Sequence, residues 1–253
     1  MDKRSKGILV GMVFGDGYLN VRTRKAGYIS SELVVVHSTS QRDYTEYKAE
    51  LIRKIFGGKH TVVDKRATLK NGKTYQLCGF SKTNKYFRIL KRLIYPYGKK
   101  TITVGALNVL TDEGLAIWYM DDGHARRNFN SLGYVSSVST MISTCCSEEE
   151  VMVVCKWFLD KHNVEFKPFR EGNGFSIRCN TNESHVFARI IEPYVIPSMR
   201  YKLSHVADLN LHERQAPIGT CSCGNNIYAN RRGGLCDTCY SRKMYKKSQA
   251  VMR

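Results

Sequence analysis

Two acidic residues, each followed by glycine, end two apolar runs that lie far apart in the sequence. The runs are Leu9-Val-Gly-Met-Val-Phe-Gly-Asp16-Gly17 and Leu115-Ala-Ile-Trp-Tyr-Met-Asp-Asp122-Gly123. Both have the length of a helix, and a glycine suits a helix C-cap that needs a left-handed backbone. A carboxylate at a helix C-terminus faces the negative end of the helix dipole. Two such carboxylates would repel each other unless a hard divalent cation lay between them, so we predict that Asp16 and Asp122 bind a metal where two repeats meet.

The first motif alone permits a second interpretation. Its sequence Val-Phe-Gly-Asp-Gly-Tyr-Leu can also form two strands around a Gly-Asp-Gly hairpin turn. Gly7, Gly11 and Gly15 favour a helix, because residues four apart lie on one helix face. Such a glycine stripe lets two helix backbones approach closely. The second motif carries Ile117 and Asp121 at the matching positions, so we expect the two motif helices to pack asymmetrically.

An internal repeat decides in favour of the helices. Two Asn-Gly pairs between alternating runs predict β-hairpins with type I′ turns. Each hairpin is followed by Thr-Asn, which suits a helix N-cap, and then by a helix that ends in Pro-Tyr. The matching pairs are Asn71-Gly72 with Asn173-Gly174, Thr83-Asn84 with Thr181-Asn182, and Pro96-Tyr97 with Pro193-Tyr194. We therefore predict an α+β fold of two pseudo-symmetric αββαββα repeats, residues 1–105 and 106–206.

With these segments laid out, the chain resembles the monomeric LAGLIDADG homing endonucleases, in the branch whose motifs end in Gly-Asp-Gly or Asp-Asp-Gly. The resemblance covers residues 5–205 and includes Tyr97-Gly-Lys-Lys and Met199-Arg-Tyr-Lys. It implies that the motif helices pack together, that their terminal acids bind catalytic metals, and that two antiparallel sheets form a saddle over duplex DNA. Phe14 and Met120 stand where the family name has its first aspartate, which is a structural position in the family.

The resemblance also implies further residues near the metals. It places one lysine per repeat there, where a lysine can neutralise developing phosphate charge or polarise water. Lys100 and Lys202 match best, Lys99 is an alternative to the first, and a plain phosphate contact remains possible for either. A polar residue that positions water is expected at the end of the second strand of each repeat. The candidates are Ser38 or Gln41 in the first repeat and Thr144 or Cys145 in the second.

The charge of the chain agrees with a nucleic-acid partner. Forty Lys and Arg against 22 Asp and Glu leave a formal net charge of +18, which points to a polyanion such as DNA or RNA. A solvated basic surface or a ribosome-associated protein is the alternative. Basic residues alternate with strand-forming ones, and strands can read base edges in the major groove. The candidate DNA contacts are Arg22, Arg24, Lys65, Arg66, Gln76, Arg126, Arg127, Lys167, Arg170 and Arg178.

Four of the nine cysteines form a separate pattern near the C-terminus. Cys221-x-Cys223 and Cys236-x-x-Cys239 are separated by twelve residues, the spacing of two knuckles that close on one tetrahedral zinc ion. Too few apolar residues lie between them to fold unaided, so the metal would supply the stability. Disulfides are the alternative, although an intracellular protein disfavours them. We predict a linker over residues 207–220 and a zinc module over 221–253, in which Arg231 and Arg232 contact DNA phosphates.

The expected compartment is intracellular, either the cytoplasm or an organelle. No apolar run approaches the roughly 18 residues of a membrane span, and the N-terminal segment lacks the form of a secretory signal. The chain begins with Met1-Asp2 and ends with Arg253, whereas an intein begins with Cys or Ser and ends with His-Asn. We therefore expect neither a secreted protein nor an intein.

The functional prediction follows from the two acids. We expect a monomer that hydrolyses both strands of a long duplex DNA site, with Mg²⁺ bound by Asp16 and Asp122. Some relatives in this fold have lost cleavage and act as RNA maturases or DNA-binding regulators, often with one motif acid missing. Both acids are present here, which favours the enzyme over that alternative.

Overall fold

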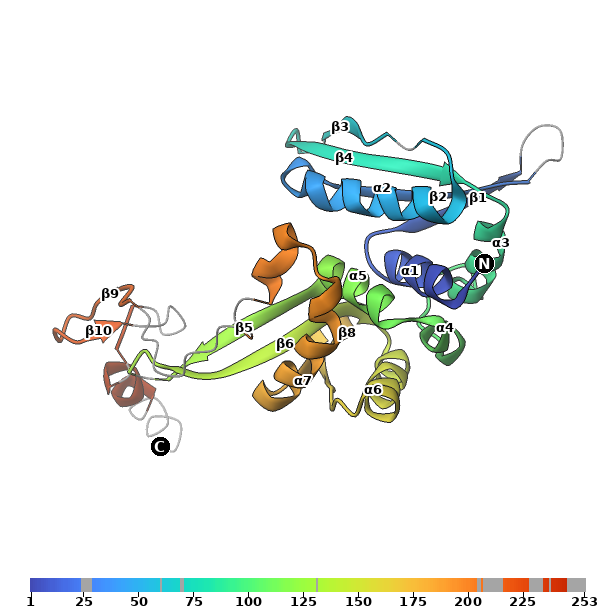
Figure 1. The fold of residues 1–253 in the computed structure, drawn as a ribbon. Coiled ribbons are helices and arrows are strands. Elements are labelled where there is room, and N and C mark those ends of the chain that lie inside the picture. The colour runs from blue at the N-terminus through green and yellow to red at the C-terminus, as the bar shows by residue number, and fades with distance from the viewer. Residues whose placement is uncertain are drawn as a thin grey trace.

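The two repeats are visible as two sheets with the same strand order. The computed structural model describes residues 1–23, 29–59, 61–68, 71–130, 132–203, 206, 216–227, 234–236 and 238–244. Among these residues, the chain forms two four-stranded antiparallel sheets, ordered β1-β2-β4-β3 and β5-β6-β8-β7, and a two-stranded module near the C-terminus (Figure 1). The predicted α+β fold with two antiparallel sheets is confirmed. The zinc content of the C-terminal module stays a prediction.

The first repeat begins with the first motif helix and follows the predicted order. Its elements are α1 (Lys3–Phe14), β1 (Tyr18–Thr23), β2 (Ile29–Ser38), a 3-10 turn (Thr39–Gln41), α2 (Arg42–Phe56), β3 (Val63–Thr68), β4 (Thr74–Thr83), α3 (Tyr86–Ile94) and a short connecting helix α4 (Val104–Val109). Helices α2 and α3 pack on one face of the sheet.

The second repeat has the same order after the second motif helix. Its elements are α5 (Asp112–Asp122), β5 (Gly123–Phe129), β6 (Val135–Cys146), α6 (Glu148–His162), β7 (Lys167–Glu171), β8 (Gly174–Cys179), α7 (Thr181–Ile191) and two 3-10 segments (Glu192–Tyr194 and Pro197–Lys202). Helices α6 and α7 pack on its sheet. The C-terminal module contains β9 (Gly219–Thr220) and β10 (Asn226–Ile227).

The two motif helices pack closely through the predicted glycine stripe. A methyl group added at Gly11 would lie 2.0 Å from the carbonyl oxygen of Gly114, and one added at Gly114 would lie 2.1 Å from that of Gly7. At the N-terminal end of the pair, Arg4 donates to both carboxylate oxygens of Glu113 at 2.6 and 2.7 Å. One hydrophobic core runs through both repeats, so the division at residues 105 and 106 stays a prediction.

The glycines that follow the motif acids serve close packing, and the expected left-handed cap is absent. Gly123 caps α5 with φ −86°, and Gly17 is not among the residues with positive φ. A methyl group at Gly17 would lie 2.5 Å from the carbonyl oxygen of Met12, and one at Gly123 would lie 2.0 Å from the Tyr119 ring. Glycine is required at both positions because no other residue fits against the preceding helix turn.

The two hairpins exist, but neither has the predicted type I′ turn. That turn needs positive φ at both central residues. In the second hairpin Glu171 pairs with Gly174, and of the central residues only Gly172 has positive φ, +58°, which is the type II′ pattern. In the first hairpin Thr68 pairs with Thr74, which leaves five residues in the loop. Residues 69–70 of that loop lie outside the described residues.

No helix in the described part of the chain has the length and apolar character needed to cross a membrane.

Candidate active site and nucleic-acid interface

The two motif acids lie at matching places beyond the packed helix pair. Asp16 stands two residues after the end of α1, and Asp122 is the last residue of α5. The pKa of Asp122 is raised to about 7, first by burial and then by the nearby Asp121 and Asp16 carboxylates, while the Lys100 ammonium acts in the opposite direction. The pKa of Asp16 is lowered, chiefly by a hydrogen bond with His37. The fold therefore brings the carboxylates of Asp16, Asp121 and Asp122 close together, and metal binding by Asp16 and Asp122 stays a prediction.

Lys100 and Lys202 occupy equivalent positions beside these acids. Lys100 Nζ donates to the carbonyl oxygen of Gly15 at 2.8 Å, and Lys202 Nζ donates to that of Asp121 at 2.8 Å. In each repeat the acceptor is the residue directly before the motif acid. Burial lowers the pKa of both lysines. Lys99, the alternative to Lys100, is an exposed residue, as is Lys100, but of the two it is the Lys100 ammonium that bonds to the residue before a motif acid.

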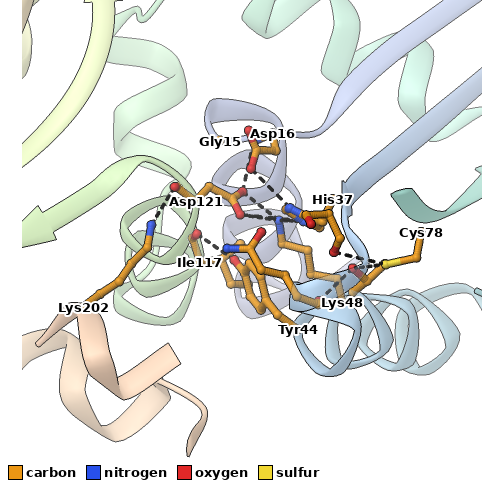
Figure 2. A network of polar contacts seen from close by, with 12 residues as sticks. Gly15, Asp16, His37, Tyr44, Lys48, Cys78, Ile117, Asp121 and Lys202 are labelled. Carbon is orange, nitrogen blue, oxygen red and sulfur yellow. Dashed lines mark hydrogen bonds and ion pairs between the residues drawn. The ribbon is translucent and has the colours of Figure 1, made fainter. Parts of the chain in front are cut away.

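A buried polar network lies next to Asp16 and was not predicted (Figure 2). Lys48 Nζ donates to the two carboxylate oxygens of Asp121 at 2.6 and 2.7 Å and lies 3.1 Å from Nε2 of His37. The side chains of Lys48 and Asp121 are fully buried, and that of His37 is 2% exposed. The other ring nitrogen of His37, Nδ1, lies 3.3 Å from the Asp16 carboxylate. The carboxylates of Asp16 and Asp121 are thus joined through a lysine and a histidine.

A signal for part of this network was present in the sequence. Lys48 lies four residues after Tyr44 and four before Ile52, both buried on α2. A lysine in the middle of an apolar helical stripe needs a charged partner, because an unpaired buried ammonium is costly. The pattern indicates that a partner exists, but it does not say that the partner comes from the other repeat.

The polar residues proposed to position water have different surroundings. The Thr144 hydroxyl donates to the carbonyl oxygen of Phe175 at 2.7 Å. Cys145 is exposed and has a left-handed φ of +50° at an irregularity between β6 and β8. Ser38 accepts a hydrogen bond from the backbone of Ser40 in the 3-10 turn. The backbone carbonyl of Gln41 accepts from Thr45.

Comparison with known proteins decides the family. A sequence model of the LAGLIDADG DNA endonuclease family matches residues 6–187. The chain belongs to this family. The RecA protein of Mycolicibacterium flavescens is 27% identical over 202 residues, which are 78% of this chain and 45% of that protein. The chain therefore spans about half the length of the RecA proteins that it matches.

Two further relatives extend the comparison. The cytochrome b mRNA maturase bI2 of Debaryomyces hansenii is 26% identical over 211 residues, which are 81% of this LAGLIDADG chain and 75% of that protein. The structure of the homing endonuclease I-WcaI bound to its DNA recognition sequence superposes with a TM-score of 0.66 and 21% identity. It covers 80% of this chain and 86% of I-WcaI. This likeness shows that the fold is shared.

In the first sheet of this LAGLIDADG chain, the predicted contacts divide between two faces. Successive side chains of a strand point to opposite faces. Cys78 is buried on the helix-packed face, where its Sγ lies 3.4 Å from the hydroxyl of Thr45 on α2. Lys65 pairs with Leu77, next to Cys78, and Arg22 pairs with Ser30. These positions put Lys65 and Arg22 on the opposite, open face. Arg66 and Gln76 pair with each other on the helix-packed face, and Arg24 lies outside the described residues.

The second sheet divides in the same way. Arg126 pairs with Ser139, and Arg178 pairs with both Met141 and Lys167. These three basic residues lie on the open face, where they line one hollow together with polar strand residues. Arg127 and Arg170, in contrast, pair with Val138 and Phe175 and lie on the helix-packed face.

The four C-terminal cysteines come together. Their Sγ atoms all lie within 4.8 Å of one another, and those of Cys223 and Cys236 are 3.4 Å apart. Four thiolates at about 2.3 Å from a tetrahedral zinc ion would lie about 3.8 Å apart, so this donor set fits zinc. Arg231 and Arg232 lie outside the described residues. Arg242 and Lys243 are exposed on the helical residues 238–244.

The raised pKa of Asp122 predicts a stability change for Asp122→Asn in the metal-free protein. The folded state holds this proton more tightly than the unfolded chain does. Ionisation therefore costs folding free energy as the pH rises from about 4 to about 7, by at most about 4 kcal/mol. We expect Asp122→Asn to melt about 3 to 10 °C above the wild type at pH 8 in EDTA, and no higher at pH 4.

Asp16→Asn is the matched control for this measurement. The pKa of Asp16 is lowered through its bond to His37, so its ionised form stabilises the fold above the ordinary pKa of aspartate. Asp16→Asn should therefore not raise the melting temperature at pH 8. Equal stabilisation by both substitutions would contradict the different surroundings of the two carboxylates.

Proposed function

We propose that this chain is a site-specific homing endonuclease that hydrolyses phosphodiester bonds in both strands of a long duplex DNA site. The observation that carries the proposal is a matched pair of sites at the end of one packed helix pair. Lys100 donates to the carbonyl directly before Asp16, and Lys202 donates to the carbonyl directly before Asp122. A duplex has two antiparallel strands related by local two-fold symmetry, so two equivalent sites suit two cuts. The membership of the chain in a DNA endonuclease family supports the same reaction.

The residues present fit a hard divalent cation. Carboxylate oxygens are the donors that Mg²⁺ prefers, and Asp122 lies partly buried beside the Asp121 and Asp16 carboxylates, which with burial raise its pKa to about 7. We therefore propose that Asp16 and Asp122 hold Mg²⁺. When bound, the metal would supply a more acidic water and stabilisation for the leaving oxygen.

The lysines and the open sheet faces complete the proposed roles. The ammonium groups of Lys100 and Lys202 would face the phosphate that carries developing negative charge. The open faces would contact DNA through Arg22, Lys65, Arg126, Lys167 and Arg178. One monomer would lie over one site, with its repeats 1–105 and 106–206 side by side. Arg66, Gln76, Arg127 and Arg170 lie on the helix-packed faces, so we leave them outside the groove-reading set.

The decisive experiment uses the purified protein and the intron-free DNA of its own insertion site. We expect a double-strand cut at one position that needs added Mg²⁺ and is abolished by EDTA. A duplex of the same composition in shuffled order should stay intact. Binding without any nicking, at several Mg²⁺ concentrations, would contradict the nuclease and leave a DNA-binding regulator.

An RNA maturase is the second candidate, and the likeness to a cytochrome b mRNA maturase over 81% of this chain favours it. A maturase would bind its own intron RNA and accelerate splicing without the motif acids. Splicing rates of the intron RNA with the wild type and with Asp16→Asn therefore separate the two functions, since only cleavage should depend on Asp16.

We propose further that residues 221–253 form a zinc module that extends the DNA contact beyond the two repeats. Elemental analysis should find one zinc ion per chain, bound by Cys221, Cys223, Cys236 and Cys239. Replacement of Cys236 and Cys239 by Ser should remove it. Unchanged zinc content in this double variant would contradict the site.

Truncation after Leu211 tests what the module does. We expect the same phosphodiester bonds to be cut with the same need for Mg²⁺, but weaker binding, because basic contacts to the DNA backbone are lost. The loss should be larger at low salt. The DNA footprint should retreat on one flank, since one module reaches one end of the site. A symmetric retreat or a shifted cut would mean that the module lies over the active site.

A further inference from the structure

The buried network of Lys48, His37 and Asp121 crosses from one repeat to the other. Lys48 lies on α2 and His37 on β2, in the first repeat, whereas Asp121 belongs to the second motif. Together they form a continuous set of polar contacts in the core, with Tyr44 donating to the Ile117 carbonyl oxygen beside them at 3.0 Å (Figure 2). We call Lys48, His37 and Asp121 the cross-repeat clamp.

The pseudo-symmetric positions of the other repeat carry no such groups. Helices α2 and α6 each have fifteen residues, which matches Lys48 with Val154, a fully buried residue. The first motif has Gly15 where the second has Asp121. On the strands, Tyr18 and His124 each follow the glycine after a motif acid, and they pair with Val34 and Met141. Three residues beyond these partners lie His37 and Thr144, which are therefore equivalent positions. At the three positions equivalent to Asp121, Lys48 and His37, the chain therefore has glycine, valine and threonine.

Stability does not account for the clamp. Two fully buried charges lose their hydration, and well-packed apolar residues at such a place are often equally or more stabilising. The other repeat shows that this backbone accepts an apolar residue at the position of the lysine. Because the fold does not need the clamp for its stability, the role of the clamp should lie in the residue that it contacts.

What the clamp touches is Asp16. The backbone N–H of Asp16 donates to Oδ2 of Asp121 at 3.0 Å, and His37 Nδ1 lies 3.3 Å from the Asp16 carboxylate. The Asp16 side chain is otherwise 47% exposed. Gly15 leaves the room for this contact, because a methyl group there would lie 2.0 Å from Oδ2 of Asp121.

We propose that Lys48, His37 and Asp121 are positioning residues for Asp16, so that the second motif and the first repeat together hold the first motif acid. Lys48 fixes the Asp121 carboxylate, Asp121 fixes the Asp16 peptide, and His37 fixes the Asp16 side chain. Asp122 has its equivalent lysine, Lys202, but no counterpart of the clamp. The two metal sites therefore differ in how firmly their acids are held, an inference that rests on the proposed metal-dependent function.

The test compares the two sites within one protein. Paramagnetic Mn²⁺ broadens nearby amide signals, and Gly17 and Gly123 directly follow the two acids. In the double variant Lys48→Met/Asp121→Ala, the Mn²⁺ concentration that half-broadens the Gly17 amide signal should rise about tenfold. Loss of a residue that supports a metal ligand weakens metal binding by about this factor. The Mn²⁺ concentration that half-broadens the Gly123 signal should change less than twofold. Equal Mn²⁺ response of Gly17 in this variant and the wild type would overturn the proposal.

The double variant also separates positioning from stability. Because it removes both buried charges together, it should melt at or above the temperature of the wild type. Lys48→Met alone leaves the buried Asp121 carboxylate without its ammonium partner and should melt lower. The matched control is Arg4→Met/Glu113→Gln, which removes an ion pair between the two motif helices, away from the clamp. That control should leave the Mn²⁺ response of Gly17 unchanged. A tenfold loss in the control as well would overturn a specific role of the clamp.

A measurement that needs no metal tests the role of the clamp even if the proposed metal site is wrong. If the wild type shows no Mn²⁺ broadening at Gly17 or Gly123, the proposed metal site fails. The clamp is then judged by hydrogen exchange of the Asp16 amide, whose proton is bonded to Asp121. That amide should exchange about tenfold faster or more in Lys48→Met/Asp121→Ala than in the wild type. An unchanged exchange rate would overturn the proposal.

Discussion

Asp16→Asn and Asp122→Asn should each abolish double-strand cleavage while leaving specific DNA binding largely intact. Each substitution removes a negative metal ligand without touching the open sheet faces. A catalytic metal supplies several kcal/mol of transition-state stabilisation, and each 1.36 kcal/mol is tenfold in rate, so we expect a loss of about a thousandfold or more. Cleavage of a plasmid that carries the insertion site measures the rate, and fluorescence anisotropy with a labelled duplex measures binding.

The pattern of residual nicking tells how far the two sites act together. If the sites are coupled, both variants should fail to nick either strand. If one variant still nicks one strand at a near-normal rate, the sites are independent and each acid serves one strand. Cleavage of both strands at a near wild-type rate in either variant would contradict the assignment of Asp16 and Asp122.

The repeat architecture could be predicted from the sequence because local signals agreed with one another. Two apolar runs of helical length, two Asn-Gly turns and two Pro-Tyr helix ends recur in the same order, and the structure has that order. The repeated segments depend on residues close in sequence, so their spacing alone reveals them. Lys100 and Lys202, in contrast, were implied by the resemblance to the LAGLIDADG homing endonucleases.

The faces of the strands were harder to predict than the strands themselves. Because side chains alternate, a register known to within one residue leaves the face undetermined. Lys65 and Arg66 are neighbours, yet only Lys65 lies on the open face. The same holds for Arg126 and Arg127. Basic composition predicts that a strand contacts a polyanion, but it cannot say which of two adjacent residues does so.

The cross-repeat clamp could not be predicted from residues that are close in sequence. Asp121 was recognised as a break in symmetry with Gly15, but its partner, Lys48, is 73 residues away in sequence. Only the packing of α2 against the end of α5 brings them together. The glycines after the motif acids were likewise interpreted as caps, although their role is set by contacts with Met12 and Tyr119. In both cases the sequence shows an unusual residue, and the contacts of that residue in the tertiary structure explain why it is there.

Lys100→Ala and Lys202→Ala should each slow cleavage by about 10- to 100-fold, the range expected when one charge-stabilising or proton-transferring group is lost. Both ammonium groups are held by backbone carbonyls directly before the motif acids, so they cannot move far to contact DNA elsewhere. DNA affinity should therefore fall only slightly. Cleavage rates under single-turnover conditions and binding over a range of salt concentrations measure the two effects separately.

Lys99→Ala is the matched control, because it removes the same charge one residue away and leaves the bond between Lys100 and the Gly15 carbonyl in place. Its cleavage rate should stay within about twofold of the wild type once binding is saturated, since an exposed charge is largely screened. A phosphate contact has a different signature: affinity falls together with rate, and the slope of binding against salt drops by about one unit. If Lys100→Ala or Lys202→Ala behaves in that way, the lysine binds DNA and takes no part in the chemical step.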